Sequence, residues 1–159
     1  MGGLRSRLGL AVATTLGTGF LPVAPGTAGA AMALAVFWFS GLRQAPWFVP
    51  WLLMALLVPL GFAGCVAGRS RWGKDPGRVN VDEFAGAWLC FCVAGPSRGL
   101  MVILASFVLF RALDVLKPWP VRAADNHDSA AGILLDDLIA GAMAGSLVRL
   151  GDLAHDVLL

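Results

Sequence analysis

The carboxylates that could do chemistry in this chain stand in three short motifs, each beside an apolar run. Asp82 and Glu83 lie in VDEF, Asp114 in RALDVLK, and Asp136 and Asp137 in ILLDDL. Ionised carboxylates in apolar surroundings are costly unless they pair with cations or bind a metal. Because every ligand of this set would be an oxygen, the pattern favours Mg²⁺ over zinc. The first function indicated is therefore a divalent cation site.

A purely structural explanation competes with this one. Asp82 could serve as the N-cap of a helix, and Arg111, Asp114 and Lys117 have the i, i+3, i+6 spacing of ion pairs on a helix surface. Either explanation suits a single acid. Two acidic doublets together with Asp114 favour the metal site, provided that the fold brings the three motifs into one layer.

Basic and glycine-rich sequence indicates an anionic ligand at the same site. Arg111 can bind a phosphate in a fork, and the ammonium of Lys117 can neutralise it as a point charge. The segment GTGFLPVAPGTAG (17–29) precedes an expected helix, and backbone N–H groups there, at Gly26 and Thr27, could cradle an anion. A plain re-entrant turn explains this segment equally well.

The composition indicates that a membrane positions these motifs. The chain has 159 residues, of which 58% are hydrophobic and 14% charged, and its mean hydropathy is +0.76. A formal net charge of +2 with scattered bases argues against nucleic acid as a partner. The basic start and the apolar stretch after it resemble a signal peptide, but glycines and threonines dilute the apolar core, and we expect no cleavage. A metal, a phosphate and a membrane surface together indicate phosphoryl chemistry on a lipid headgroup.

The apolar runs are too long for strands and lack their period-two alternation, so we expect an all-α fold. The prediction is a single domain over 1–159, a compact bundle of about five or six helices that is integral to or embedded in the membrane. Pro50 and Pro59 should bend the second run, and Gly141 and Gly145 give the last helix a small-residue face. The expected apolar segments are 27–40, 47–68, 84–94, 100–116 and 133–150.

Basic residues on the two sides of these segments predict an orientation. If the later segments each cross, one side holds Arg5, Arg7, Arg69, Arg71, Lys74, Arg78, Arg111, Lys117 and Arg122, and the other holds Arg43, Arg98 and Arg149. The positive-inside rule then puts the first group, and the acidic motifs with it, in the cytoplasm. This topology requires the stretch before Thr27 to be re-entrant or peripheral.

The cysteines and histidines are not expected to do chemistry. Cys65, Cys90 and Cys92 lie in apolar segments and read as small buried hydrophobes. CVAGRSR has the Cys-x5-Arg spacing of thiol-based phosphatases, but that chemistry needs a loop between a strand and a helix. His127 lies in a polar loop and should be solvated. His155 lies in a C-terminal tail that looks dispensable.

Four motifs in register resemble the phosphatidylglycerophosphatase A family of bacterial lipid phosphatases. They are GTGFLPVAPGTAGA (17–30), VDEFAGAW (81–88), FRALDVLKPWP (110–120) and GILLDDLIAG (132–141), and they cover nearly all the polar sequence. One departure is Ala30, where the family's glycine-rich motif often has a serine. A serine hydroxyl is therefore not required at that position.

The resemblance implies a Mg²⁺-dependent enzyme that hydrolyses phosphatidylglycerophosphate to phosphatidylglycerol and inorganic phosphate at the inner face of the cytoplasmic membrane. The five acids of the three motifs resemble the family's acidic positions and would hold the metal and orient a water for in-line attack. Arg111 and Lys117 resemble its basic positions and would stabilise charge on the phosphoryl group. The alternative is a non-enzymatic small transporter or assembly protein whose acids line an ion path. The sequence leaves the oligomeric state open.

Overall fold

The computed structural model describes residues 3–74, 76–95 and 99–158, and the regular secondary structure of that part of the chain is helical, without strands. The predicted all-α fold is therefore confirmed, although seven α-helices exceed the five or six expected. The two short ones, α1 and α6, account for the difference. The helices are α1 (Leu4–Ala13), α2 (Pro25–Phe39), α3 (Phe48–Trp72), α4 (Val81–Ala94), α5 (Leu100–Leu116), α6 (Val121–Asp125) and α7 (Ala130–Leu158), with 3₁₀ turns η1 (Thr18–Phe20) and η2 (Leu42–Gln44).

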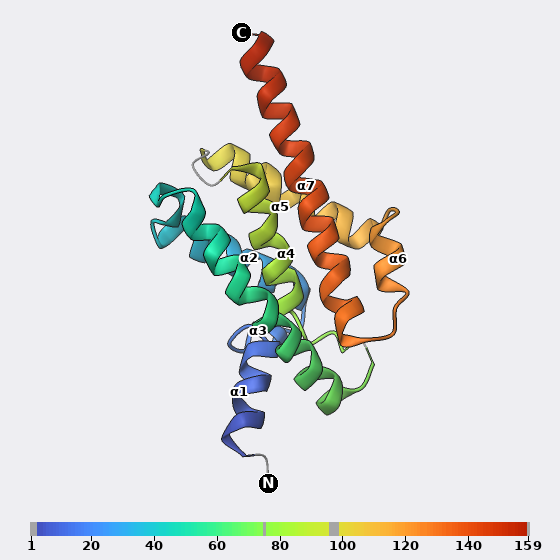
Figure 1. Ribbon diagram of the computed structural model, residues 1–159. Coiled ribbons are helices and arrows are strands. Elements are labelled where there is room, and N and C mark those ends of the chain that lie inside the picture. The colour runs from blue at the N-terminus through green and yellow to red at the C-terminus, as the bar shows by residue number, and fades with distance from the viewer. Residues whose placement is uncertain (1–2, 75, 96–98, 159) are drawn as a thin grey trace.

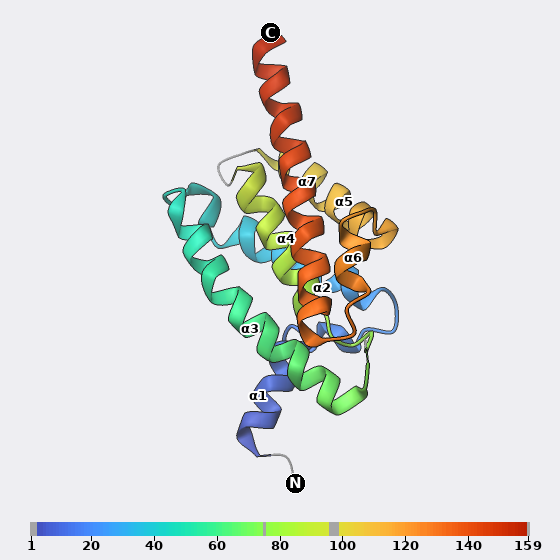
Figure 2. The ribbon, with the colours of Figure 1, turned by 45° about the vertical axis from the view of Figure 1, so that its right-hand side comes forward.

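Helix α4 forms the centre of the bundle, with α2, α3, α5 and α7 packed around it (Figures 1 and 2). It begins at Val81, so the acidic pair Asp82 and Glu83 belongs to its first turn, and its N-cap residue is Asn80. The alternative in which Asp82 caps this helix is therefore wrong. At 14 residues α4 is about 21 Å long, less than a ~30 Å hydrocarbon layer.

Glycines let α7 lie directly against α4. A Cβ on Gly141 would collide with the carbonyl oxygen of Gly86, and one on Gly145 would come within 2.6 Å of the carbonyl oxygen of Cys90. The predicted small-residue face of the last helix thus exists, and it faces α4. Because position 141 matches 86 and position 145 matches 90, the two helices run parallel. Their first turns, which carry the acids, lie at the same end of the bundle.

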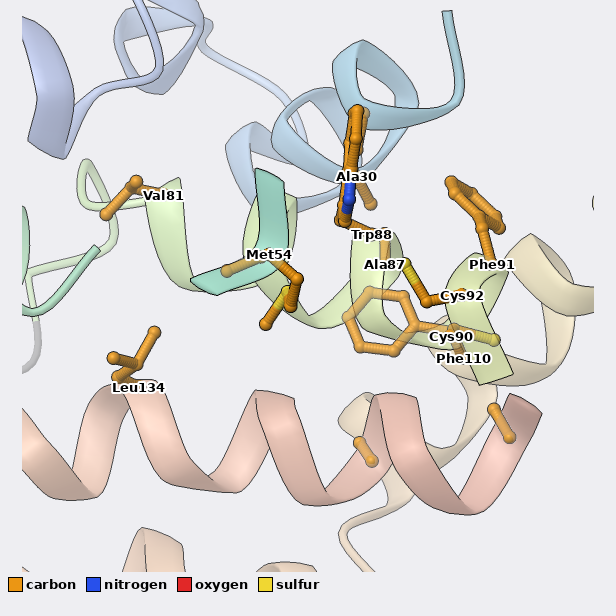
Figure 3. Packing of buried hydrophobic residues seen from close by; sticks show 14 of the residues in the cluster. Ala30, Met54, Val81, Ala87, Trp88, Cys90, Phe91, Cys92, Phe110 and Leu134 are labelled. Carbon is orange, nitrogen blue, oxygen red and sulfur yellow. The ribbon is translucent and has the colours of Figure 1, made fainter. Parts of the chain in front are cut away.

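Aromatic side chains fill the space between α4 and its neighbours (Figure 3). Phe37 of α2 packs edge-on against Trp88, with ring centroids 5.4 Å apart, and lies 5.2 Å from Phe91. The indole nitrogen of Trp88 donates a hydrogen bond of 3.0 Å to the carbonyl oxygen of Pro50. That contact ties the start of α3 to the middle of α4 and satisfies the one polar atom of the indole.

The outward faces of the helices are strongly apolar. Leu52, Leu56 and Leu60 project from α3 and are at least half exposed, and Met101 and Val108 do the same on α5. Two described helices are long and apolar enough to cross a membrane by length and composition: α3, and α7 over Ala130–His155. An apolar exterior around a packed core agrees with the predicted membrane association.

The structure adds detail that the expected segments lacked. Helix α2 begins at Pro25 instead of residue 27, which places Gly26 and Thr27 in its first turn. The stretch from 122 to 132, expected as a polar loop, contains α6 and the start of α7. Helix α7 also continues beyond the expected end at 150 and includes His155. Arg98, counted above with the basic residues, lies outside the described residues.

Helix α1 packs antiparallel against the second half of α3. A Cβ on Gly9 would lie 3.0 Å from the Cβ of Ala67, and Gly64 faces the backbone of Ala13. The start of α1, with Arg5 and Arg7, therefore lies at the end of α3 that carries Arg69 and Arg71. With only ten residues, α1 is about 15 Å long and too short to cross a bilayer.

Candidate functional site: a buried carboxylate cluster

Three carboxylates meet where the first turns of α4 and α7 lie side by side. One oxygen from each of Asp82, Glu83 and Asp137 lies within 4.8 Å of the other two. Asp82 is only 6% exposed and Asp137 only 3%. The close contact of α7 with Gly86 produces this meeting, since Gly86 packs against the backbone carbonyl of Asp137.

The same three side chains have buried oxygens without a hydrogen-bond partner among the described residues. These atoms are Asp82 Oδ1, Glu83 Oε2 and Asp137 Oδ1. Three carboxylates at this separation repel one another, and burial removes the water that would screen them. A divalent cation with oxygen ligands would relieve both costs, so the donor set fits such an ion.

The other two acids of the predicted site are engaged by cations. Asp114 forms an ion pair with Arg111 one turn earlier on α5. Oδ2 of Asp136 accepts a hydrogen bond of 2.8 Å from Lys117, and Oδ1 accepts one of 3.0 Å from the backbone N–H of Asp137. The structure thus brings all five acids to one end of the bundle and divides them into a cluster of three and two paired residues.

Lys117 occupies a special position between helices. It follows the last residue of α5 with a left-handed backbone (φ 46°), and its ammonium also pairs with Asp125 of α6. Partial burial alone would lower the pKa of Lys117, but the hydrogen bonds from its ammonium to Asp125 and Asp136 raise the pKa above its ordinary value. The side chain therefore carries a full positive charge at neutral pH.

The glycine-rich segment closes the other side of the cluster. A Cβ at Gly26 would collide with a carboxylate oxygen of Glu83 and lie 3.4 Å from a guanidinium nitrogen of Arg111. Only glycine fits this close approach. Thr27, the other residue predicted to bind phosphate, is half-buried in the same first turn of α2.

Asn80 fastens that segment to α4, a role that the sequence did not reveal. Its side-chain amide donates hydrogen bonds of 2.8 Å to the hydroxyl of Thr18 and to the carbonyl of Pro25. Its own carbonyl accepts a 3.1 Å bond from the hydroxyl of Thr15. Asn80 directly precedes the VDEF motif and is fully buried. The signal in the sequence is its position: an amide side chain directly before two acids, where a polar loop turns into an apolar run.

The acids and Lys117 line a cavity of about 210 Å³. It is bounded by Asp82, Glu83, Asp114, Lys117, Asp136, Asp137 and Ile133 together with residues that the sequence did not single out as site residues: Arg69, Asp125, Asn126, His127 and Asp128. The missed residues all carry polar side chains. Four of them are consecutive in the segment DNHD (125–128), here called the DNHD loop, which begins at the last residue of α6 and lies between two site motifs. His127 is exposed, as predicted, and it also lines this cavity.

Asp128 anchors that loop to the end of α3. Its carboxylate accepts a 2.8 Å hydrogen bond from Arg69 and pairs with Lys74. The bonds from Lys74 and Arg69 lower the pKa of Asp128 below its ordinary value. The loop is thus held across the cavity by ion pairs that span 59 and 54 residues of sequence.

The cysteines lie away from this site. Cys65 is fully buried inside α3, and Cys90 and Cys92 are buried in α4. As expected, they pack as small hydrophobes, and the Cys-x5-Arg spacing falls on a continuous helix instead of a phosphate-binding loop.

Comparison with known proteins gives a consistent family. A sequence profile described as phosphatidylglycerophosphatase A matches residues 11–152. A Bacteroides thetaiotaomicron protein with the provisional name phosphatidylinositol-3-phosphatase is 38% identical over 148 residues, which cover 90% of this chain and 92% of that protein.

Two further relatives carry the family's name. The phosphatidylglycerophosphatase A of Escherichia coli is 34% identical over 145 residues, covering 86% of this chain and 79% of the relative. That of Haemophilus influenzae is 35% identical over 137 residues, covering 84% and 82%. No solved structure shows a significant match. By sequence profile and by relatives that align over most of its length, the chain belongs to the phosphatidylglycerophosphatase A family and is a phosphatase.

Proposed function

We propose that this enzyme hydrolyses the terminal phosphate of phosphatidylglycerophosphate, releasing phosphatidylglycerol and inorganic phosphate. The observation that carries the proposal is the cluster of Asp82, Glu83 and Asp137. Each has a buried oxygen without a hydrogen-bond partner in the part of the chain that the structure describes, and all three residues line the same cavity as Lys117. A divalent cation and a basic side chain close together would stabilise the charge that develops on a phosphoryl group, and the residues lining this cavity could supply both.

Mg²⁺ is the cation that we propose for the cluster. Asp82, Glu83 and Asp137 would hold it, since hard oxygen ligands suit Mg²⁺ and the end of the bundle leaves room for the waters that this ion retains. When bound, Mg²⁺ would neutralise developing charge on the phosphoryl oxygens. A carboxylate of the cluster would also orient the attacking water.

The paired residues would place the positive charges that the reaction needs. Arg111 is held by Asp114, and Lys117 is held between Asp125 and Asp136. Both cations would contact the phosphoryl group, and their acidic partners would act as positioning residues. Gly26 would let the first turn of α2, including Thr27, approach the same group with its free N–H donors.

We further propose that the cavity faces the cytoplasm at the inner membrane. Arg5, Arg7, Arg69, Arg71 and Lys74 lie at one end of the bundle, because α1 runs antiparallel to α3 and both place these residues at that end. The carboxylate cluster opens there as well, through Arg69 and the DNHD loop. An excess of bases at one membrane surface supports a cytoplasmic location for it.

The Bacteroides relative suggests a second substrate. Its provisional name is a phosphatidylinositol-3-phosphatase, which acts on a phosphate carried by a secondary ring carbon instead of a primary glycerol carbon. Both are monoesters on anionic lipids, so the same acids and bases could serve either. The two substrates therefore belong in one assay.

The test is release of inorganic phosphate by purified protein in detergent micelles. Phosphatidylglycerophosphate and phosphatidylinositol 3-phosphate are supplied separately, each with Mg²⁺, with EDTA, and with EDTA followed by excess Mg²⁺. We expect release from phosphatidylglycerophosphate that EDTA abolishes and Mg²⁺ restores. Preferential release from the inositol lipid would shift the proposal to that substrate, and release that EDTA leaves intact would overturn the role of the metal.

A further inference from the structure

A second cavity adjoins the carboxylate site on the side of α6. It has a volume of about 310 Å³ and is lined by Lys117, Pro118, Trp119, Arg122, Ala123 and Asn126. Lys117 and Asn126 line both cavities. The two cavities are therefore neighbours, and the ammonium that we assign to the reacting phosphate lies in the wall between them.

The chemistry of the second cavity differs from that of the first. No carboxylate lines it, and its positive groups are Lys117 and Arg122. Among the described residues, the ion pairs of the chain include none to Arg122. Lys117, in contrast, is already neutralised by two acids. Arg122 thus offers an exposed guanidinium that is free to bind an anion without displacing a partner.

Apolar side chains flank this cavity where it opens. Trp119 is 82% exposed, and Leu116, directly before Lys117, is 69% exposed. An exposed tryptophan and leucine, next to an arginine without an ion pair among the described residues, form a surface that suits the boundary between lipid headgroups and acyl chains. An occupant of this cavity should therefore be anionic on one side and continuous with lipid on the other.

We infer that the second cavity binds the phosphodiester of the lipid substrate, with Arg122 as the residue that recognises it. The inference rests on the proposed function, because phosphatidylglycerophosphate has two phosphates: a terminal monoester and a diester one glycerol unit away, next to the diacylglycerol. If the monoester binds at the carboxylate cluster, the diester would lie beyond Lys117, in the second cavity. Arg122 would then bind the diester, while Trp119 contacts the glycerol backbone. Arg122 acts here in substrate binding and specificity and takes no part in the bond cleavage.

The experiment compares Arg122→Gln with Arg71→Gln in phosphatidylglycerophosphate micelles. Arg71 is an exposed arginine at the same end of the bundle and lines neither cavity, so its loss reproduces the change in surface charge alone. For Arg122→Gln we expect KM to rise about ten-fold with kcat changed less than about two-fold, because a charge-assisted hydrogen bond to bound substrate is lost. Arg122→Lys should recover most of the affinity, and Arg71→Gln should keep both constants.

Inhibition by inorganic phosphate separates the two cavities. Inorganic phosphate should compete chiefly with the monoester, because it lacks the lipid part that we propose to hold the diester at Arg122. Its inhibition constant should therefore be the same in the natural enzyme and in Arg122→Gln. An equal rise of KM in Arg122→Gln and Arg71→Gln would overturn the inference, as would a fall in kcat at constant KM or weakened inhibition by phosphate. Failure of the proposed function itself would be seen earlier, as absence of release by the natural enzyme.

Discussion

Asp128 and Asp137 line the same cavity, but they differ in burial and in the partners of their carboxylate oxygens. Asp128 is on the surface, and both of its carboxylate oxygens pair with bases on α3 or just after it. Asp137 is buried beside Asp82 and Glu83, and one of its oxygens has no hydrogen-bond partner within the described ranges of the chain. An exposed pair of this kind contributes little to stability, whereas buried carboxylates that face each other reduce it. An external cation would relieve only the second arrangement, and we therefore propose the buried acids, and not Asp128, as the functional ones.

The largest effect is expected when the buried cluster loses a charge. Asp137→Asn should lower kcat/KM for phosphatidylglycerophosphate by ~1000-fold, because the cation would lose a ligand. The same change should raise the melting temperature of the metal-free protein, since it removes repulsion from Asp82 and Glu83. Phosphate release and thermal unfolding in EDTA check the two halves. An active variant, or one destabilised without metal, would contradict the assignment.

The next effect concerns the helix contact that brings the cluster together. Gly141→Ala places a Cβ against the carbonyl of Gly86, so α7 must move away from α4 and carry Asp137 with it. We expect roughly 1–3 kcal/mol of lost stability and a 10–100-fold fall in kcat, roughly what a displacement near 1 Å costs. Gly151→Ala is the matched control on the same helix, because its Cβ meets nothing within 4 Å. Equal effects at both positions would argue against this account.

A smaller effect is expected to distinguish Lys117, which lines the carboxylate cavity, from Lys74, which pairs with Asp128. Lys117→Met removes the ammonium that we propose to contact the reacting phosphate, and it should lower kcat about ten-fold. Lys74→Met removes only one of the two partners of Asp128, so kcat should stay near that of the natural enzyme. Steady-state kinetics on both variants tests the comparison. Similar losses of kcat in the two variants would mean that the total positive charge near the cavity matters more than the position of the ammonium.

The smallest effect is expected at Asp128 itself. Asp128→Asn should change kcat less than about two-fold, because exposed ion pairs are weak and Arg69 and Lys74 remain solvated. The pKa of Asp128 is lowered in the folded state from its ordinary 3.8. Its contribution to stability is therefore complete above that ordinary value and is lost as the pH falls through the lowered folded value. The free energies of unfolding of the natural enzyme and of Asp128→Asn, measured from unfolding curves, should converge only in that acidic range.

The sequence predicted those elements whose ends carry strong local signals. The end of α5 at Leu116 follows from Pro118 and Pro120, and the small-residue face of α7 follows from the spacing of Gly141 and Gly145. That this face packs on α4 became clear only from the structure. Helices α1 and α6 were missed because they are short and have no apolar period of their own. Tertiary contacts with α3 and α7 stabilise them.

The same distinction between local signals and tertiary contacts applies to the site residues. Acids beside apolar runs were recognisable as candidates because burial of charge is unusual wherever it occurs. Which acids would be paired depended on distant partners: Asp136 on Lys117, and Asp128 on Arg69, 59 residues away. The roles of Asn80 and Arg122 were hidden for the same reason, since one joins three segments and the other lines a cavity that exists only in the folded chain.

Direct binding of the cation tests the central claim, that Asp82, Glu83 and Asp137 form a site for Mg²⁺. The measurement is the melting temperature of metal-free protein in detergent as Mg²⁺ is added, for the natural enzyme, Asp137→Asn and Asp128→Asn. Binding to the folded state alone raises the melting temperature with concentration. The account predicts a saturable rise for the natural enzyme and Asp128→Asn and none for Asp137→Asn. A rise of equal size in Asp137→Asn, or no rise in the natural enzyme, would contradict it.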